Sequence, residues 1–374
     1  MSAHVTFDAG PPGGGTRFAA PRDTIEAWEA DQVMPALARM EAARNAGAWL
    51  AGYLSYETGY AFSRKLAPLM PPDRDLPLLS FGVFDAPGAA PPPDTGPAML
   101  TDLAPLWDAA RYAEAFAQVQ RYISAGDIYQ ANLTFPVEAR ATGTPRALYA
   151  ALRARQPVRH GALVELGGPA ILCRSPELFF DIDPTGRIRT RPMKGTAPRG
   201  ATPDADAALR AALLASEKNR AENLMIVDLL RNDISRISRV GSVTVPRLFH
   251  IESYETVHQM VSDVEGVLTP GLALGDVIRA LFPCGSITGA PKIRAMQIIR
   301  ALEPWPRGVY CGAVGWIAPD GAMRMGVAIR TLVMWPDGRV RLNVGGGVVH
   351  DSDGGGEYEE ALWKARFADL SPTG

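Results

Sequence analysis

Apolar side chains recur at every third or fourth position in several segments of the chain, a spacing typical of amphipathic helices. Gly126 follows one of these segments and Pro291 begins another, as expected at the two ends of a helix. Residues 224–227 are apolar on every face, so we expect the helix that contains them to be buried. The predicted helices cover residues 28–43, 111–125, 205–234, 291–302 and 356–367.

Shorter runs of apolar, β-branched and aromatic residues predict strands. The runs at residues 171–182 and 187–191 flank a Pro-Thr-Gly turn at residues 184–186, and therefore predict a hairpin. Because helices and strands do not alternate regularly, we expect an α+β fold rather than a series of βαβ units. The other predicted strands cover residues 49–56, 310–317, 323–334 and 340–344.

A proline-rich stretch at residues 86–105 divides the chain. Proline can continue neither a helix nor a sheet ladder, so we expect a surface connection here. This connection separates an N-terminal region, residues 1–100, from a main body, residues 101–370. The N-terminal region contains strands that can pack into the main body.

Composition and charge exclude several classes of protein. The chain has 374 residues, 47% of them hydrophobic, which is enough for a buried core and excludes a mainly disordered chain. Lysine and arginine number 38 against 40 aspartates and glutamates, so the near-neutral charge gives no reason to expect nucleic-acid or membrane binding. No uncharged run reaches the ~18 residues of a membrane span. Residues 1–10 show no secretory signal.

The cysteines add a prediction about the compartment. Cys173, Cys284 and Cys311 have neither the close spacing of a disulfide framework nor the companion histidines of a zinc site. Such cysteines are typical of a reducing environment. We therefore expect the protein in the cytoplasm.

Two glycine-rich segments are candidate anion sites. Residues 285–289 lead into a predicted helix, whose free N–H groups favour a carboxylate or phosphate. Gly345, Gly346 and Gly347 would let the backbone approach a ligand closely. Neither segment has the glycine spacing of a nucleotide-binding loop. Taken alone, each segment is more often an ordinary turn.

Acidic side chains form a candidate cation site. Glu357, Glu360 and Lys364 share one face of the last predicted helix. Glu222 precedes the apolar run of another helix, and a carboxylate that enters the interior needs a partner. Mg²⁺ suits such a set, because it takes one or two protein carboxylates and keeps several waters. The alternative is a solvated acidic face that stabilises the start of a helix.

Lys194 and Glu177 lie near the same end of the predicted hairpin. A partly desolvated lysine beside another cation can act as a nucleophile. A glutamate in the same pocket can give a proton to a departing oxygen. The alternative is a cross-strand ion pair worth under ~1 kcal/mol. Spacing alone favours that alternative.

Taken together, the ordered motifs of residues 106–368 resemble the chorismate-utilising enzymes, the family that makes anthranilate, aminodeoxychorismate, isochorismate and salicylate. The resemblance implies an α+β body of two orthogonally packed, antiparallel-rich sheets flanked by helices. The motifs are GDIYQ at 126–130, SPE at 175–177, RPMKGT at 191–196, RAEN at 220–223, DLLRND at 228–233, GSITGAPK at 285–292, IRT at 329–331, GGG at 345–347, and EYEE at 357–360 with Lys364.

Two positions distinguish the reactions of this family. Members that activate water carry lysine where this chain has Gln130, so the resemblance argues against isochorismate or salicylate formation. Members that form anthranilate usually carry alanine where Lys194 stands. Lys194 therefore implies amination of chorismate to 4-amino-4-deoxychorismate, which leads to 4-aminobenzoate and folate. The alternatives are anthranilate formation and, less favoured, a non-catalytic chorismate-binding subunit.

The resemblance also implies a role for each candidate residue. Lys194 would add covalently at C2 while Glu177 protonates the departing C4 hydroxyl, and ammonia would then displace the lysine. Mg²⁺ would be held by Glu222, Glu357 and Glu360, and Asn219, which replaces a glutamate of the anthranilate-forming members, leaves the rest of the metal shell open. For His258 a purely structural role is equally open. The substrate contacts would come from Gln130, His258, Thr288, Tyr310, Arg330, Gly345, Gly346, Gly347 and Lys364.

The resemblance implies a source of ammonia as well. None of the cysteines lies in the setting of a glutaminase nucleophile. The chain is therefore expected to use free ammonia, or ammonia supplied by a separate glutamine amidotransferase subunit.

Overall fold

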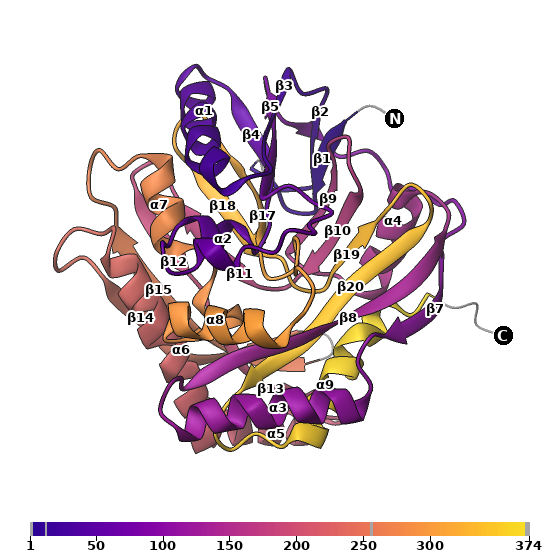
Figure 1. The fold of residues 1–374 in the computed structure, drawn as a ribbon, viewed down its shortest axis with the longest axis vertical. Helices are drawn as coiled ribbons and strands as arrows, with labels where there is room; N and C mark the ends of the chain where they lie inside the picture. Colours follow the sequence, from indigo (N-terminus) through magenta and orange to yellow (C-terminus); the bar gives the residue numbers. More distant parts are fainter. Residues whose placement is uncertain (1–2, 12, 255–256, 371–374) are drawn as a thin grey trace.

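A computed structural model describes residues 3–11, 13–254 and 257–370. Its strands form two ten-stranded antiparallel sheets, with helices on their outer faces (Figure 1). This confirms the α+β prediction. The N-terminal strands belong to both sheets, because β1 pairs with β9 in the first sheet and β4 pairs with β17 in the second.

Each sheet takes its strands from several separate parts of the chain. The first sheet has the order β16 (Gly289–Ala290), β8 (Gln130–Thr142), β20 (Arg339–Val348), β19 (Thr331–Met334), β10 (Ala170–Ser175), β9 (His160–Glu165), β1 (His4–Phe7), β2 (Thr16–Ala19) and β6 (Gly88–Ala89), with β7 (Met99–Pro105) beside β8. The second has the order β13 (Met193–Pro198), β15 (Val257–Val267), β12 (Arg187–Thr190), β11 (Leu178–Ile182), β18 (Met323–Val327), β17 (Ala313–Ile317), β4 (Trp49–Leu54), β5 (Leu79–Phe84) and β3 (Asp23–Ala27), with β14 (Thr244–Ser253) beside β15.

Hydrophobic clusters hold these layers together. One cluster, which includes Phe18, Trp316 and Val333, lies between the two sheets. The other clusters lie on the outer faces, where full burial of each large apolar side chain contributes about 1.5–3 kcal/mol. The first sheet is covered by α3 (Ala109–Ser124), α4 (Pro145–Arg155) and α9 (Gly354–Ala365), and the second by α1 (Val33–Asn45), α6 (Glu217–Ser235) and α7 (Leu274–Leu281). The remaining helices are α2 (Thr58–Ala61), α5 (Pro203–Ala215) and α8 (Lys292–Leu302).

Two predicted strands are each divided between the sheets. Residues 171–182 form β10 in the first sheet and β11 in the second, with the break at Pro176, which has no N–H to donate. Residues 323–334 likewise form β18 and β19, with the break at Arg330, whose φ is 50°. The prediction of single strands was wrong because both sides of each break have the same apolar pattern. The hairpin of β11 and β12 is confirmed.

The long predicted helix and the proline-rich stretch also need correction. Residues 205–234 form two helices, because the Ser216 side chain accepts a hydrogen bond from the Asn219 backbone and starts α6 anew. The centre of α6 is buried on one face only, since Leu224 is 42% exposed. Residues 99–105 form an edge strand, β7, rather than an irregular connection. An edge strand tolerates proline because one side of its ladder stays unpaired.

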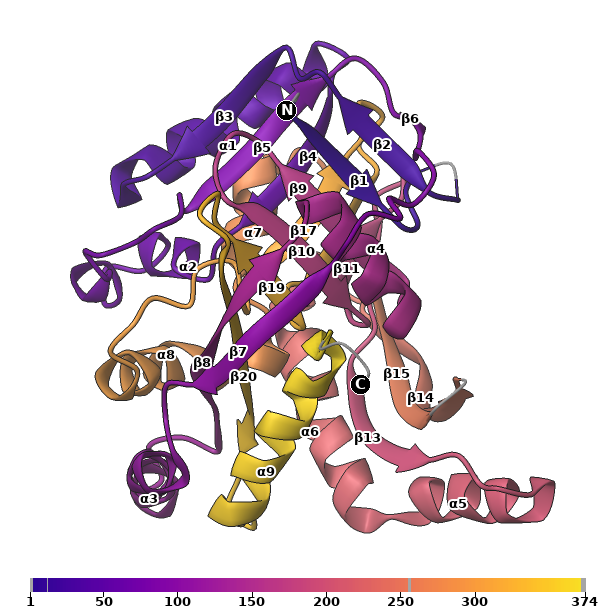
Figure 2. The same ribbon diagram turned by 90° about the vertical axis from the view of Figure 1, so that its right-hand side faces the viewer.

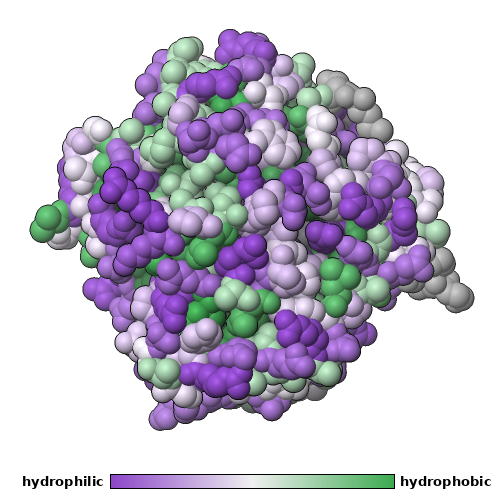
Figure 3. Space-filling model, in the orientation of Figure 1, coloured by the Kyte–Doolittle hydropathy of each residue, from purple (hydrophilic) through white to green (hydrophobic). Residues whose placement is uncertain are grey.

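The outer surface is mixed in character. On the face shown in Figure 3, hydrophilic side chains are interspersed with hydrophobic ones. Among the residues that the structure describes, none of the helices is both long enough and apolar enough to pass through a membrane.

A buried ion pair links β8 to the chain after α8. Glu303 accepts two hydrogen bonds from the Arg307 guanidinium, at 2.7 and 2.8 Å, and a third from the backbone of Thr134 at 2.9 Å. Both charged side chains are almost fully buried. The pair therefore has little solvent to screen it.

Glu303→Ala is expected to lower the free energy of unfolding by about 3–5 kcal/mol, because the Arg307 guanidinium is left buried without its partner. Urea denaturation measures the change. The matched control is Glu114→Ala, which removes the exposed pair with Arg111 and should cost less than about 1 kcal/mol. Equal losses for the two variants would contradict this account of the buried pair.

Candidate active site

The chain passes from the first sheet to the second at residues 176–177, the first crossing, and returns at residues 328–330, the second crossing. The two crossings lie side by side and carry Glu177 and Arg330, two of the predicted site residues. The backbone N–H of Arg174 donates to the carbonyl of Arg330 at 2.9 Å, and that of Val327 donates to the carbonyl of Glu177 at 3.1 Å. Glu177 and Arg330 are therefore held close together although they are far apart in sequence. Figure 1 shows β10 and β11 leading into each other near the centre of the molecule.

Glu177 has the properties of a proton donor. Its side chain is 8% exposed, and one carboxylate oxygen, Oε1, accepts a hydrogen bond from Ser286 Oγ at 2.8 Å. Burial raises the pKa of Glu177 to about 7, although the Ser286 hydroxyl and the charges of Lys194 and Arg330 act in the opposite direction. A carboxyl group with this pKa is partly protonated near neutral pH and can give up its proton.

Arg330 presents free donors to the same space. Burial lowers the pKa of its guanidinium, and the Glu177 carboxylate partly offsets this effect. Within the described residues the guanidinium has no hydrogen-bond partner, in contrast to the fully paired Arg307. An arginine held in this way can bind a carboxylate through two parallel hydrogen bonds.

Lys194 lies on β13, opposite helix α6. Its Nζ is 3.4 Å from Glu222 Oε2, and its carbonyl accepts a hydrogen bond from Asn223 Nδ2 at 3.3 Å. Gly195 follows with a φ of 98°, and a Cβ there would lie 3.1 Å from the Asn219 side chain. The strand register is irregular between Met193 and Thr196, and at Gly195 the strand passes close to α6. Glu177, Lys194 and Arg330 are near enough for the two cations to affect the pKa of the acid.

Helix α9 carries a second lysine and two carboxylates, and the carboxylate of Glu360 lies within electrostatic range of Lys194 on β13 and Lys218 on α6. Figure 2 shows α9, α6 and β13 in the lower half of the molecule. Lys364 Nζ lies 2.8 Å from Glu360 Oε1 and donates to the Gly345 carbonyl at 2.9 Å. Burial raises the pKa of Glu360, but the charges of Lys364, Lys194 and Lys218 outweigh burial, and the net shift is downward. Lys194 therefore lies within electrostatic range of both Glu177 at the first crossing and Glu360 on α9.

The glycines of β20 are required by the neighbouring side chains and backbone. A Cβ at Gly346 would lie 2.8 Å from Glu357 Oε2, and one at Gly345 would lie 2.2 Å from the carbonyl of Leu133. A Cβ at Gly347 would lie 3.0 Å from the amide of Gln130. The strand therefore passes close to the acidic helix on one side and to β8 on the other.

Gln130 is buried beneath this strand. Its side chain is 1% exposed, and among the described residues its Oε1 has no hydrogen-bond partner. A buried carboxamide oxygen without a partner costs roughly 1–3 kcal/mol. A bound molecule or a water that donates to this oxygen would remove that cost.

The predicted metal ligands have suitable chemistry but separate partners. Glu222 is paired with Lys194, Glu360 with Lys364, and Glu357 accepts a hydrogen bond from Ser352 at 2.7 Å. Within the described residues no cluster of three acidic, histidine or cysteine side chains is spaced to hold an ion. Carboxylate oxygens are nonetheless the donors that Mg²⁺ takes. Lys194 and Lys364 each place a positive charge beside one of these carboxylates. The Asn219 amide nitrogen, Nδ2, donates to Ser216 Oγ at 2.9 Å, which fixes the orientation of this side chain.

The structure places Thr288 and Ser286 differently from the sequence interpretation. The Thr288 hydroxyl is fully buried and donates to the carbonyls of Cys284 and Gly285, which closes the tight turn Gly285–Ile287. Ser286, which sequence reasoning did not select, points to Glu177. The sequence held one signal for Ser286, which lies in the same glycine-flanked segment as Thr288. Either of these two hydroxyls could face the site.

His258 has structural partners on both ring nitrogens. Nδ1 lies 2.8 Å from Ser253 Oγ, and Nε2 lies 3.0 Å from Asp206 Oδ1. The ring is fully buried. Of the two roles that the sequence left open, these contacts fit the structural one.

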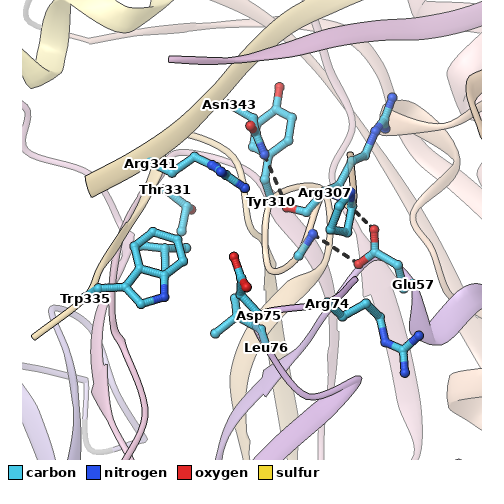
Figure 4. A pocket seen from close by; sticks show the side chains of 13 residues that line it. Glu57, Arg74, Asp75, Leu76, Arg307, Tyr310, Thr331, Trp335, Arg341 and Asn343 are labelled. Atoms are coloured by element: carbon cyan, nitrogen blue, oxygen red, sulfur yellow. Dashed lines mark hydrogen bonds between the residues drawn. The ribbon is translucent and has the colours of Figure 1, made fainter. Parts of the chain in front are cut away.

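Tyr310 lines a small cavity of about 30 Å³, which charged and apolar side chains enclose together (Figure 4). Figure 4 shows its hydroxyl directed away from Asp75 and Leu76. Glu57, which also lines the cavity, accepts hydrogen bonds from the backbones of Arg307 and Gly308 at 2.6 and 3.0 Å. The adjoining Cys311 backbone donates to Ala328 in the second crossing, so Tyr310 is tied to the segment that carries Arg330.

Comparison with known proteins shows the family of this chain. The family model described as chorismate binding enzyme matches residues 86–369. The chain belongs to this family of chorismate-binding enzymes.

Curated relatives include both amination branches of the family. An aminodeoxychorismate synthase from Streptomyces griseus is 47% identical over 276 residues, 74% of this chain and 37% of that protein. Aminodeoxychorismate synthase component 1 from Klebsiella aerogenes is 45% identical over 253 residues, 68% of this chain and 56% of that protein. An anthranilate synthase component 1 from Haloarcula marismortui is also 45% identical, over 68% of this chain and 52% of that protein. The matched part of this chain thus spans roughly half of these relatives or less.

Solved structures share the fold. Anthranilate synthase component I from Streptococcus pneumoniae superposes with a TM-score of 0.79 at 25% identity, covering 98% of this chain and 90% of that one. The menaquinone-specific isochorismate synthase from Escherichia coli has a TM-score of 0.74 at 16% identity, covering 98% and 87%. The predicted chorismate-binding fold is therefore confirmed.

Proposed function

We propose that this chain catalyses the Mg²⁺-dependent amination of chorismate to 4-amino-4-deoxychorismate, the precursor of 4-aminobenzoate. The observation that carries the proposal is that Lys194 and Arg330 lie within electrostatic range of the buried acid Glu177, while the Arg330 guanidinium has no hydrogen-bond partner among the described residues. The aminodeoxychorismate synthases among the relatives support the same reaction.

The proposed reaction has two displacements. The uncharged amine of Lys194 attacks ring carbon C2, the two ring double bonds shift, and the C4 hydroxyl leaves as water with a proton from Glu177. Ammonia then attacks C4, the double bonds return, the C2–N bond to Lys194 breaks, and the proton that the new ammonium group loses returns to Glu177. The sum is chorismate plus ammonia giving aminodeoxychorismate plus water. Because each attack occurs on the face opposite the leaving group, the configuration at C4 is retained.

Orientation of the substrate would fall to Arg330, Lys364 and the glycines of β20. Chorismate carries two carboxylates, and Arg330 can bind one of them bidentately, next to Tyr310. Lys364 and the backbone of Gly345 to Gly347 lie at the other side of the space, where the ring carboxylate would be held. Fixing both ends places C2 near Lys194 and C4 near Glu177, which accounts for much of the rate enhancement of such reactions.

Mg²⁺, held by Glu222, Glu357 and Glu360, would supply positive charge for the ring carboxylate. Two of these carboxylates now pair with lysines, Glu222 with Lys194 and Glu360 with Lys364, so a bound ion would share them with these side chains.

Glu360→Gln is expected to weaken Mg²⁺ binding by about 10–100-fold, since a carboxylate is lost from the donor set. Isothermal titration calorimetry with Mg²⁺ alone measures this without reference to activity. Glu359→Gln is the matched control, because this exposed neighbour on the same helix has no place in the proposed ligand set. Undiminished Mg²⁺ affinity in Glu360→Gln would remove Glu360 from that set.

Ammonia is proposed to come from a glutamine amidotransferase partner, with free ammonia as the substitute in its absence. Component 1 in the name of the Klebsiella aerogenes relative supports a second subunit. Addition of such a subunit should let glutamine replace ammonium as the nitrogen source.

Product identity tests the proposed function directly. The purified chain is incubated with chorismate, Mg²⁺ and ammonium, and the products are separated with and without an added aminodeoxychorismate lyase. We expect aminodeoxychorismate alone, and 4-aminobenzoate only when the lyase is present. Anthranilate formed without the lyase would establish the anthranilate reaction, which the Haloarcula marismortui and Streptococcus pneumoniae relatives favour. Binding of chorismate without turnover would establish a non-catalytic subunit.

A further inference from the structure

The side chain of Glu177 has a single hydrogen-bonding anchor among the described residues. Its backbone is fixed by Ser175, whose Oγ accepts from the Glu177 N–H at 3.2 Å, and by the second crossing. The carboxyl group itself is held only by Ser286, which donates to Oε1 at 2.8 Å. Without that bond the carboxyl could rotate about its side-chain torsions, since the backbone contacts do not restrict it.

Ser286 is itself held in a rigid setting. It lies in the tight turn Gly285–Ile287, which Thr288 closes from inside through two hydrogen bonds. Its hydroxyl also lies 3.2 Å from Cys284 Sγ, so the oxygen sits between a thiol and the carboxylate. Gly285 packs against Leu229 of α6, where a Cβ would lie 2.4 Å from the leucine side chain. The backbone that carries the Ser286 hydroxyl is therefore fixed by the turn and by its packing on α6.

We propose that Ser286 is a positioning residue for Glu177: it binds Oε1 of the carboxyl and leaves Oε2 as the oxygen that carries the proton toward the substrate. This inference rests on the proposed function, in which Glu177 protonates the leaving hydroxyl. A general acid is effective only when its proton lies within hydrogen-bonding distance of the leaving oxygen. A loss of 1 Å in such placement can cost about a hundredfold in rate.

The hydrogen bond also affects the charge state of the acid. The groups that face Glu177 are Lys194 from β13, Arg330 from the second crossing, and the thiols of Cys284 and Cys311. Burial and the Glu177 charge raise the pKa of Cys284 to about 12, and burial raises that of Cys311 to about 12, so both thiols are neutral near pH 7. A hydroxyl that donates to the carboxylate stabilises its ionised form and lowers the pKa. Removal of the Ser286 hydroxyl therefore raises the pKa of Glu177.

The test compares Ser286→Ala with Ser286→Thr in the ammonium-dependent reaction, measured as kcat against pH. For Ser286→Ala we expect kcat to fall by ~10–100-fold, while the descending limb of the profile moves upward by about one pH unit. Ser286→Thr keeps the hydroxyl and should restore both quantities to within about threefold of the wild type. A residue that served only the packing of the turn would lower activity without moving the limb.

If Ser286→Ala is too slow to assay, a measurement that does not depend on turnover still tests the proposal. Infrared titration of the carboxyl stretch, with Glu177→Gln as the blank, reports the protonation of Glu177 itself. An upward shift of that titration in Ser286→Ala supports the proposal. A titration or pH profile that coincides with the wild type would overturn it.

The same set of proteins separates this inference from the proposed function. If the wild type forms no aminodeoxychorismate, or if Glu177→Gln keeps its activity, the proposed reaction or the role of its acid fails. If the wild type is active and Glu177→Gln is not, but Ser286→Ala behaves as the wild type, only the positioning role fails.

Discussion

Lys194→Ala is expected to abolish amination of chorismate, with kcat reduced by at least about 10³-fold, because nucleophile removal has effects of this size or larger in enzymes with covalent mechanisms. The fold should be unaffected. Lys194 is partly exposed, and its pair with Glu222 at 3.4 Å is worth less than about 1 kcal/mol. The measurement is the rate of product formation with saturating ammonium and Mg²⁺.

A direct search for the covalent intermediate accompanies this variant. In the absence of ammonia, the wild type incubated with chorismate should gain the mass of chorismate less water, and proteolytic fragments should locate the adduct on Lys194. Lys65→Ala is the matched control, since this exposed lysine lies in a loop outside the site and should keep both the rate and the adduct. Wild-type turnover in Lys194→Ala would eliminate the covalent step.

Glu177→Gln is expected to lower kcat by about 10²–10⁴-fold, the usual contribution of a general acid. Glutamine has nearly the same shape and can still accept the Ser286 hydrogen bond, but it has no proton to give. In the wild type, kcat should decline as the pH rises through about 7, because the acid must be protonated and burial raises the pKa of Glu177 to that value. A wild-type profile that stays level from pH 6 to pH 8 would contradict the assignment of the acid.

The stability of Glu177→Gln provides its control. The folded pKa of Glu177 lies above its ordinary value of 4.5, so the native state binds the proton more tightly than the unfolded state does. Native stability is therefore lost as the pH rises from about 4.5 to about 7, by roughly 3 kcal/mol at full effect. Glu177→Gln removes this loss and should be more stable than the wild type at pH 8 in urea denaturation. Low activity in a less stable variant would point to misfolding instead of a lost proton.

Much of the fold follows from local pattern. The periodic helix now seen as α3 and the β11–β12 hairpin were predicted because their signals lie within a few residues of sequence. The divided strands at Pro176 and Arg330 were missed because a strand that changes sheets keeps its apolar character throughout. Which sheet a run joins depends on partners far along the chain, and these leave no local trace.

For the site, the sequence predicts which types of residue are present, but it does not predict the direction of each side chain. The residue types at Lys194, Glu177 and Glu360 led to the predicted chemistry, and in the structure the charge of Lys194 acts on both acids. The choice between Ser286 and Thr288 was not available from sequence, since both are small hydroxyl residues in one turn. Their roles are separated by the direction of each side chain, which depends on how the turn packs against α6.

The groups that would touch the substrate come from both layers of the molecule. Lys194 belongs to the second sheet, Gly345 to Gly347 belong to the first, and Glu177 and Arg330 lie where the chain passes from one to the other. A molecule bound among them would contact both sheets and so link the two layers. Binding of such a molecule should therefore restrict movement of one sheet relative to the other. It should slow amide hydrogen exchange in both sheets, including at residues that do not touch the ligand.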